Sequence, residues 1–157
     1  MKNIFGLTRE DLEEYFLSIG EKKFKTLQVF EWLYIHKKWN INEFSNIKKD
    51  IQNKLSEDFS TDFIKIEIVE EGPLVKKFLF RLLDGEKIEA VLMEHDYGLS
   101  VCVSSQVGCN MGCRFCESGR LKKVRNLETY EIVEQILLIE KYIGKRIDSV
   151  VMMGIGE

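Results

Sequence analysis

Three of the four cysteines in the chain lie close together, as Cys109, Cys113 and Cys116, with the spacing Cys-x3-Cys-x2-Cys. Cysteine thiolates are the usual ligands of iron–sulfur clusters. Three thiolates on one short loop suit a [4Fe-4S] cluster, and three ligands for four irons leave one iron free to bind a substrate or cofactor. The spacing therefore predicts a catalytic cluster rather than one that only carries electrons.

The alternatives are a zinc site, a disulfide pair and unrelated buried thiols. Structural zinc loops usually combine two separated pairs of ligands, and this sequence has no distant second pair of cysteines. Disulfide frameworks are typical of short secreted chains, whereas residues 1–6 show no secretory signal. The iron–sulfur cluster is therefore the favoured interpretation.

The elements that must position this loop change character along the chain. Residues 1–60 are expected to be helical, with a capping-box start at Thr8 and helices near 24–37 and 47–59. Residues 62–94 alternate with a period of two around Asp84-Gly85, the dipeptide of a tight hairpin turn, which predicts a small antiparallel sheet.

The cysteine loop itself lies between a strand and a helix. A strand is expected at 99–104, a helix at 128–143 ending at Gly144, and a fully buried parallel strand at 147–153. Strand, loop, helix and strand form one βαβ unit, the building block of barrels whose chemistry lies at the carboxyl ends of the strands. We therefore predict an α/β chain with three parts: a helical accessory domain (1–60), a β-hairpin linker (61–97) and an incomplete first βαβ unit of a barrel (98–157).

Composition sets looser limits on function. The 157 residues are 45% hydrophobic and 31% charged, with a net charge of −3, as in an ordinary soluble protein. This charge argues against nucleic-acid binding driven by total charge but allows a local basic face. No apolar run approaches a membrane span, so a cytoplasmic, reducing location without membrane contact is expected, and it suits thiolate ligands.

The cysteine spacing, with Phe115 before the last cysteine, resembles the loop of the radical S-adenosylmethionine (SAM) superfamily, in which the free iron chelates SAM. Longer blocks of sequence resemble one family within it, the radical-SAM ribosomal RNA adenine methyltransferases (the RlmN/Cfr family). These blocks are residues 102–109, 125–127 and 150–157, together with Gln28-x3-Trp32-Leu33-Tyr34 in the accessory region. The resemblance extends over essentially the whole chain.

This resemblance implies an activity and its cofactors. The family methylates carbon-2 of adenine 2503 in 23S rRNA, or carbon-8 in its resistance branch, and some members also modify tRNA at adenine 37. It uses a [4Fe-4S] cluster, SAM and a reducing electron donor, and a monomer is expected. By resemblance, Cys109, Cys113 and Cys116 hold the cluster, while Phe115, Gly156 and Glu157 contact SAM.

The same resemblance assigns two catalytic residues. Glu89 matches the family's proposed proton acceptor; judged without the family, it is a solvated hairpin carboxylate. Cys102, otherwise a small buried hydrophobe, matches the cysteine that releases the methylated base together with a methyl-carrying cysteine near the C-terminus. That second cysteine has no counterpart here, so the resemblance implies a front portion of a longer enzyme that is inactive by itself.

A basic strip follows the first cysteines and is a candidate for contact with RNA phosphates, although a solvated loop is the alternative. Its members are Arg114, Arg120, Lys122, Lys123 and Arg125. Two other functions compete with rRNA methylation: an RNA- or ribosome-binding module without chemistry, and a different radical-SAM enzyme. The segment 116–123 also departs from the family's usual stretch with Thr-Gly and a further Gly, and Ile155 replaces its usual methionine.

Overall fold

The computed structural model describes residues 1–157, which divide into two compact units, Met1–Asp62 and Phe63–Glu157. The expected linker (61–97) and the expected βαβ segment (98–157) share one sheet in the second unit. None of the helices has the length and apolar composition needed to cross a lipid bilayer.

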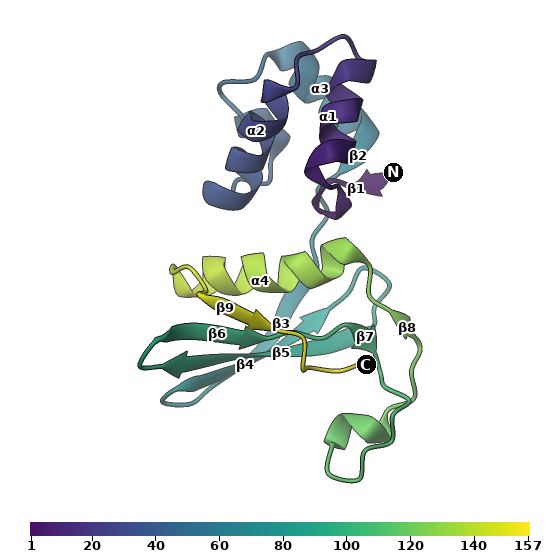
Figure 1. Cartoon of the computed structure of the whole chain (residues 1–157), viewed down its shortest axis with the longest axis vertical. Coiled ribbons are helices and arrows are strands. Elements are labelled where there is room, and N and C mark those ends of the chain that lie inside the picture. The colour runs from purple at the N-terminus through teal and green to yellow at the C-terminus, as the bar shows by residue number, and fades with distance from the viewer. The chain divides into compact units, whose positions relative to one another are not determined.

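The first unit is mainly helical, as predicted (Figure 1). Its α-helices are α1 (Arg9–Ser18), α2 (Phe24–Phe30) and α3 (Lys49–Asp58); its short elements are β1 (Lys2–Asn3), β2 (Phe59–Ser60), 3-10 helices at Ile4–Gly6 and Ile41–Glu43, and a π-helix at Glu31–Ile35. The predicted capping box is confirmed, because the Thr8 hydroxyl accepts from the Asp11 amide (3.1 Å) and the Asp11 carboxylate accepts from the Thr8 amide (2.8 Å). Large apolar side chains from all three α-helices fill the core, including Leu12, Phe16, Val29 and Leu55.

Three details of this unit differ from the prediction. The helix expected over 24–37 is α-helical only to Phe30 and continues as the π-helix, and the helix expected over 47–59 begins at Lys49. The parallel pair β1–β2 was not predicted. Strands of two residues are too short to show a hydrophobic period.

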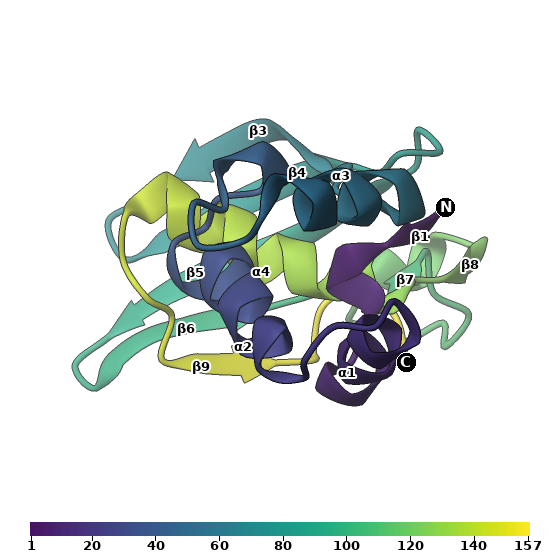
Figure 2. The ribbon, with the colours of Figure 1, turned by 90° about the horizontal axis from the view of Figure 1, so that it is seen from above.

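The second unit is a five-stranded sheet in the order β3-β4-β5-β6-β9, with the helix α4 (Thr129–Ile143) across it (Figures 1 and 2). The strands are β3 (Lys65–Glu71), β4 (Val75–Arg81), β5 (Lys87–His95), β6 (Gly98–Cys102) and β9 (Ser149–Val151). A separate two-stranded ribbon joins β7 (Gln106–Val107) to β8 (Arg125–Asn126), and a 3-10 helix spans Glu117–Arg120. The hairpin predicted at Asp84-Gly85 is confirmed as the antiparallel pair β4–β5.

The two faces of this sheet have different roles. Phe78, Phe80, Ile88 and Val101 are buried in one core with Ile139 of α4. Because side chains alternate along a strand, the residues next to these along each strand point to the opposite face. There Leu79 pairs with Glu89, and Val91 pairs with Cys102. Glu89 and Cys102 therefore lie on the sheet face away from α4.

The strand–helix–strand unit predicted in the last part of the chain is present, since β6 and β9 pair in parallel and α4 lies between them in sequence. Gly144 ends α4 in a left-handed conformation (φ 67°), as expected. The prediction of a fully buried final strand over 147–153 is wrong, because β9 covers only Ser149–Val151 and Val150 is 43% exposed. The reason is its position: β9 is an edge strand, paired with β6 alone.

Candidate cofactor site at the ends of two parallel strands

The predicted functional segments meet beyond the carboxyl ends of β6 and β9. Because these strands are parallel, both ends lie at the same edge of the sheet. Residues 103–109, which lead into the cysteine loop, follow β6, and Gly154-Ile155-Gly156-Glu157 follows β9. Figure 1 shows the last residues of the chain beside β7.

Main-chain hydrogen bonds join these two segments directly. The Gly154 amide donates to the Val103 carbonyl (3.0 Å), and the amides of Ser105 and Gln106 both donate to the Ile155 carbonyl (2.9 and 3.0 Å). The segments cross so closely at Gly154 that a Cβ there would lie 2.6 Å from the Val103 carbonyl oxygen. Only glycine permits this approach.

The side chain of Gln106 extends the contact to the residues expected to bind SAM. Its Nε2 donates to the Glu157 carbonyl (2.8 Å) and to Asn126 Oδ1 (3.0 Å), and its Oε1 accepts from the Glu157 amide (3.2 Å). Gly156 has φ +118°, and a Cβ there would lie 2.7 Å from atoms of the Gln106 side chain. Gly156 and Glu157 are thus held next to the start of the cysteine loop, with the Glu157 side chain exposed.

The cysteine loop projects from the β7–β8 ribbon. Every hydrogen bond of residues 110–123 stays within the segment 107–124, including Cys109 amide to Leu121 carbonyl (2.9 Å) and Cys116 amide to Cys113 carbonyl (3.1 Å). All four cysteines are free thiols; Cys109 is buried, and Cys113 and Cys116 are half-buried. Phe115 is 94% exposed.

The three thiols do not gather in this conformation into a group able to hold a metal ion. Their chemistry nevertheless fits an iron–sulfur cluster: they are soft donors, none is consumed in a disulfide, and all lie in one loop. The loop has no hydrogen bonds to the rest of the unit that would oppose its closing around a cluster. The donor set therefore fits the cofactor, and the loop must rearrange to bind it.

The two predicted catalytic residues lie on the open sheet face. The Glu89 carboxylate is 3.2 Å from the Lys77 ammonium, which also lies 3.8 Å from Glu70. Glu89 raises the pKa of Lys77 above its usual value, as expected for an ion pair. Cys102 ends β6, where it pairs with Val91 on one side and Val151 on the other.

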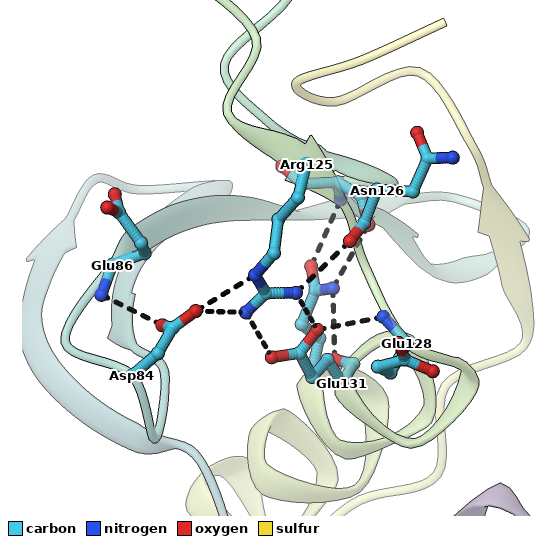
Figure 3. Close-up of polar contacts among 8 residues, drawn as sticks. Asp84, Glu86, Arg125, Asn126, Glu128 and Glu131 are labelled. Carbon is cyan, nitrogen blue, oxygen red and sulfur yellow. Dashed lines mark hydrogen bonds and ion pairs between the residues drawn. The ribbon is translucent and has the colours of Figure 1, made fainter.

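The members of the basic strip differ in exposure and in their ion pairs. Arg114, Lys122 and Lys123 are exposed, and Arg120 forms an exposed pair with Glu117 (3.2 Å). Arg125 instead faces inward between two carboxylates (Figure 3). Its Nη1 and Nη2 donate to the two oxygens of Glu131, both at 2.7 Å, while Nε and Nη2 contact Asp84 Oδ2 at 2.9 and 2.7 Å.

These charges alter one another's protonation. Hydrogen bonding to Glu131, with a smaller contribution from Asp84, raises the pKa of Arg125 although partial burial opposes it. Partial burial acts to raise the pKa of Asp84, but hydrogen bonds from the Glu86 amide and from Arg125 outweigh it and hold this pKa below its usual value. The guanidinium is committed to internal partners, so the exposed basic strip consists of Arg114, Arg120, Lys122 and Lys123.

Sequence reasoning missed several residues that organise this site: Lys77, Asp84, Ser104, Gln106 and Glu131. The hairpin signal located Asp84 but not its partner Arg125, which lies 41 positions away. Ser104 and Gln106 were visible only as parts of the segment 102–109, which resembles the family. The available signal was a polar side chain at a buried position, which indicates hydrogen-bond partners because buried polar groups are almost always hydrogen-bonded.

Comparisons with known proteins agree with this arrangement. The second unit and the chain as a whole have the fold of a solved radical SAM methyltransferase from Sphaerobacter thermophilus, with a TM-score of 0.87 and 30% identity over 100% of this chain and 48% of that one. The chain is thus a mixed α/β part of that fold.

Family models and sequence relatives are more specific. Residues 2–60 match the RlmN-type ribosomal RNA large subunit methyltransferase N-terminal domain. The chain is 49% identical to a probable dual-specificity RNA methyltransferase RlmN of Enterococcus faecalis, over 99% of this chain and 45% of the relative, and 45% identical to one of Spiroplasma citri, over 100% and 47%. The resemblance to the RlmN family is thereby confirmed along the whole chain, which spans slightly less than half the length of these relatives.

Proposed function

We propose that this chain carries the cluster- and SAM-binding part of a radical-SAM RNA methyltransferase, which methylates carbon-2 of adenine 2503 in 23S rRNA and also adenine 37 of tRNA. One observation carries the proposal: the segment preceding the cysteine loop and the segment 154–157 are hydrogen-bonded together beyond the ends of two parallel strands. Open α/β sheets bind ligands at this position. The RlmN-type relatives support the choice of substrate.

Each residue then has a role. Cys109, Cys113 and Cys116 would hold the [4Fe-4S] cluster, which would supply one-electron reduction of SAM when bound. Glu157 would accept hydrogen bonds from the amino group of SAM, with Gly156 and Phe115 also in contact with SAM. Glu89, whose carboxylate lies 3.2 Å from the ammonium of Lys77, would accept a proton from the substrate. Cys102 would act as the thiol that releases the product.

The proposal extends to the fold. Residues 1–60 would be the accessory domain, residues 61–97 a hairpin region leading to the catalytic part, and β6–α4–β9 the first unit of a partial (β/α) barrel. In such barrels the inner face carries catalytic side chains at the ends of strands. The face away from α4, which bears Glu89 and Cys102, would be that inner face.

The test is anaerobic iron–sulfur reconstitution of the protein, followed by iron and sulfide counts and an electron paramagnetic resonance spectrum with and without SAM. We expect about four irons per chain, as the cluster type requires, and a spectrum that shifts on adding SAM. Alanine at Cys109, Cys113 or Cys116 should abolish iron binding, whereas Cys102→Ala, the fourth cysteine, is the matched control and should retain it. Tightly held zinc, or iron retained by all three variants, would refute the cluster assignment.

The cysteines present also lead to a proposal about the activity of this chain by itself. The family mechanism requires a methyl-carrying cysteine near the C-terminus, and none of the four cysteines matches it. We therefore propose that the 157-residue chain transfers no methyl group by itself. Transfer of labelled methyl from SAM to 23S rRNA by this chain would contradict that.

An RNA- or ribosome-binding module without chemistry is the second candidate, favoured by the exposed cations Arg114, Lys122 and Lys123. It predicts salt-sensitive RNA binding by the cluster-free protein and no response of any bound iron to SAM. The electron paramagnetic resonance experiment separates the two candidates, because only the methyltransferase requires SAM to bind beside the cluster.

A further inference from the structure

The hydroxyl of Ser104 joins two segments that the proposed function uses separately. Ser104 Oγ donates a hydrogen bond to the Glu89 carbonyl oxygen (2.6 Å) and accepts one from the Ile155 amide (3.0 Å). Glu89 belongs to β5, and Ile155 belongs to the segment that follows β9. One buried oxygen atom therefore links the main chain at the predicted proton acceptor to the main chain at the predicted SAM segment.

The rest of Ser104 is also fixed, so that the hydroxyl cannot easily move. Its amide donates to Gln135 Oε1 (3.0 Å), and its carbonyl accepts from Gln135 Nε2 (3.1 Å). Both residues are fully buried, and Gln135 lies on α4. Every polar group of Ser104 is thus paired with protein, away from water. In such surroundings a hydrogen bond has few competitors, and an unpaired group is costly.

The main chain at the adjacent Gly154 approaches Ser104 closely, which limits how far the two segments can shift. A Cβ at Gly154 would lie 2.8 Å from the Ser104 amide nitrogen, so the two chains are already at their closest approach. The Ile155 carbonyl is held from the other side by the amides of Ser105 and Gln106. Both the amide and the carbonyl of Ile155 are therefore hydrogen-bonded, and the acceptor for the amide is the Ser104 hydroxyl.

We propose that Ser104 is a positioning residue for SAM binding: its hydroxyl sets the position of residues 155–157 relative to β5 and thereby orients Glu157 toward the cofactor. The inference rests on the proposed function, because it concerns the same site. It assigns Ser104 no contact with SAM and no part in the chemistry. Its effect is on the precision with which an existing ligand-binding segment is held, which is the usual role of supporting hydrogen bonds.

The first test measures the contact itself. In Ser104→Ala the Ile155 amide loses its acceptor, and we expect its hydrogen exchange to accelerate about tenfold, the value of one net hydrogen bond. The Gly154 and Gln106 amides, whose main-chain acceptors remain, report any general loosening. Ser149→Ala, the same change at an exposed position of β9, should alter none of these amides. Unchanged protection of Ile155 in Ser104→Ala would overturn the inference.

The second test measures its consequence, in full-length protein with a reconstituted cluster. Ser104→Ala should weaken SAM binding about tenfold, by the same hydrogen-bond energy, as measured by equilibrium dialysis and by the spectral shift, with unchanged iron and sulfide counts. Ser104→Thr, which keeps the hydroxyl, should bind SAM more tightly than Ser104→Ala. A purely structural role would lower the unfolding temperature and leave the SAM affinity of the folded, iron-loaded protein unchanged, and that result would also overturn the inference.

These results can be told apart from failure of the proposed function. If the wild-type protein binds a cluster and SAM but Ser104→Ala binds SAM equally well, only the role of Ser104 is wrong. If the reconstituted wild-type protein does not respond to SAM, both the proposed function and the positioning role fail. If Ser104→Ala does not fold, Ser104→Thr decides: SAM affinity close to wild type supports the inference, and a tenfold loss with normal iron content contradicts it.

Discussion

The Glu131 carboxylate receives both terminal nitrogens of the Arg125 guanidinium, each at 2.7 Å, and also the Glu128 amide at 2.8 Å (Figure 3). Glu131 is buried in the first turn of α4, and Arg125 lies in β8, at the base of the cysteine loop. Asp84 in the β4–β5 turn contacts the same guanidinium. The base of the loop is therefore fixed to a helix and a hairpin at once.

Breaking this contact is expected to destabilise the second unit. Arg125→Met removes the partner of a carboxylate whose side chain is only 2% exposed. Loss of one member of a buried pair leaves the other charge uncompensated, so we expect a loss of about 3 kcal/mol in the free energy of unfolding. Urea unfolding measures it. Lys123→Met, two residues earlier and exposed, is the matched control and should change the free energy by less than about 0.5 kcal/mol.

RNA binding is expected to depend on the exposed lysines and not on Arg125. Lys122→Ala and Lys123→Ala each remove an exposed cation, and each should weaken RNA binding and lower the slope of log affinity against log salt by about one if it contacts a phosphate. Arg125→Lys should leave that slope unchanged, because the side chain stays within its internal carboxylates. Titration of labelled RNA at several salt concentrations is the measurement. Equal slopes for wild type and both lysine variants would remove these lysines from the RNA surface.

The crossing at Gly154 gives a steric prediction. In Gly154→Ala the new methyl would lie 2.6 Å from the Val103 carbonyl oxygen, a main-chain atom that cannot turn away. We expect a loss of about 2 kcal/mol in stability, typical of forced overpacking, together with loss of Ile155 amide protection. Gly72→Ala, whose nearest contact would be the Val75 carbonyl oxygen at 3.3 Å, is the control. A Gly154→Ala protein as stable as this control would show that the two segments lie further apart.

Acid should weaken the second unit through Asp84. Its folded pKa lies below the unfolded value near 3.8, so its carboxylate contributes stability that is complete above the unfolded pKa and is lost as the pH falls through the folded pKa. The fall in unfolding free energy between pH 7 and pH 3 should therefore be smaller in Asp84→Asn than in wild type. Asp96→Asn, in the exposed β5–β6 turn, should show the wild-type fall, and an identical fall in Asp84→Asn would exclude this linkage.

Sequence patterns predicted the local features of the fold well. The capping box at Thr8, the hairpin at Asp84-Gly85 and the end of α4 at Gly144 each depend on a few neighbouring residues, and each is confirmed. The final strand was assigned as fully buried because its apolar run resembles an interior strand. Burial depends on what lies beside a strand, and β9 has only β6 next to it, which no local pattern records.

The predictions for the site divide in the same way: local motifs were visible in the sequence, and contacts between elements were not. The cysteine spacing and the Gly-Ile-Gly-Glu segment were visible in the sequence, and the structure brings the start of the cysteine loop and the second segment together. The inward orientation of Arg125 was not predicted, because the order of charges along the sequence does not show that Glu131, six positions later, and Asp84, 41 positions earlier, both contact the guanidinium. The hydroxyl of Ser104 was missed for a similar reason: its two partners lie 15 positions earlier, in β5, and 51 positions later, in the segment that follows β9.

The strand order of the second unit has a consequence for how the protein is made. Strands β3 to β6 are neighbours in sequence as well as in the sheet, so they can pair by short hairpin closures, whereas β6 must wait for β9, with Ser100 pairing with Ser149. Long-range pairing costs more chain entropy and forms late. During synthesis the meander would therefore form first, and the cysteine loop would emerge from the ribosome before β9 completes the sheet. Pairing of β6 with β9 would then be the step that brings residues 154–157 against the segment preceding the cysteine loop.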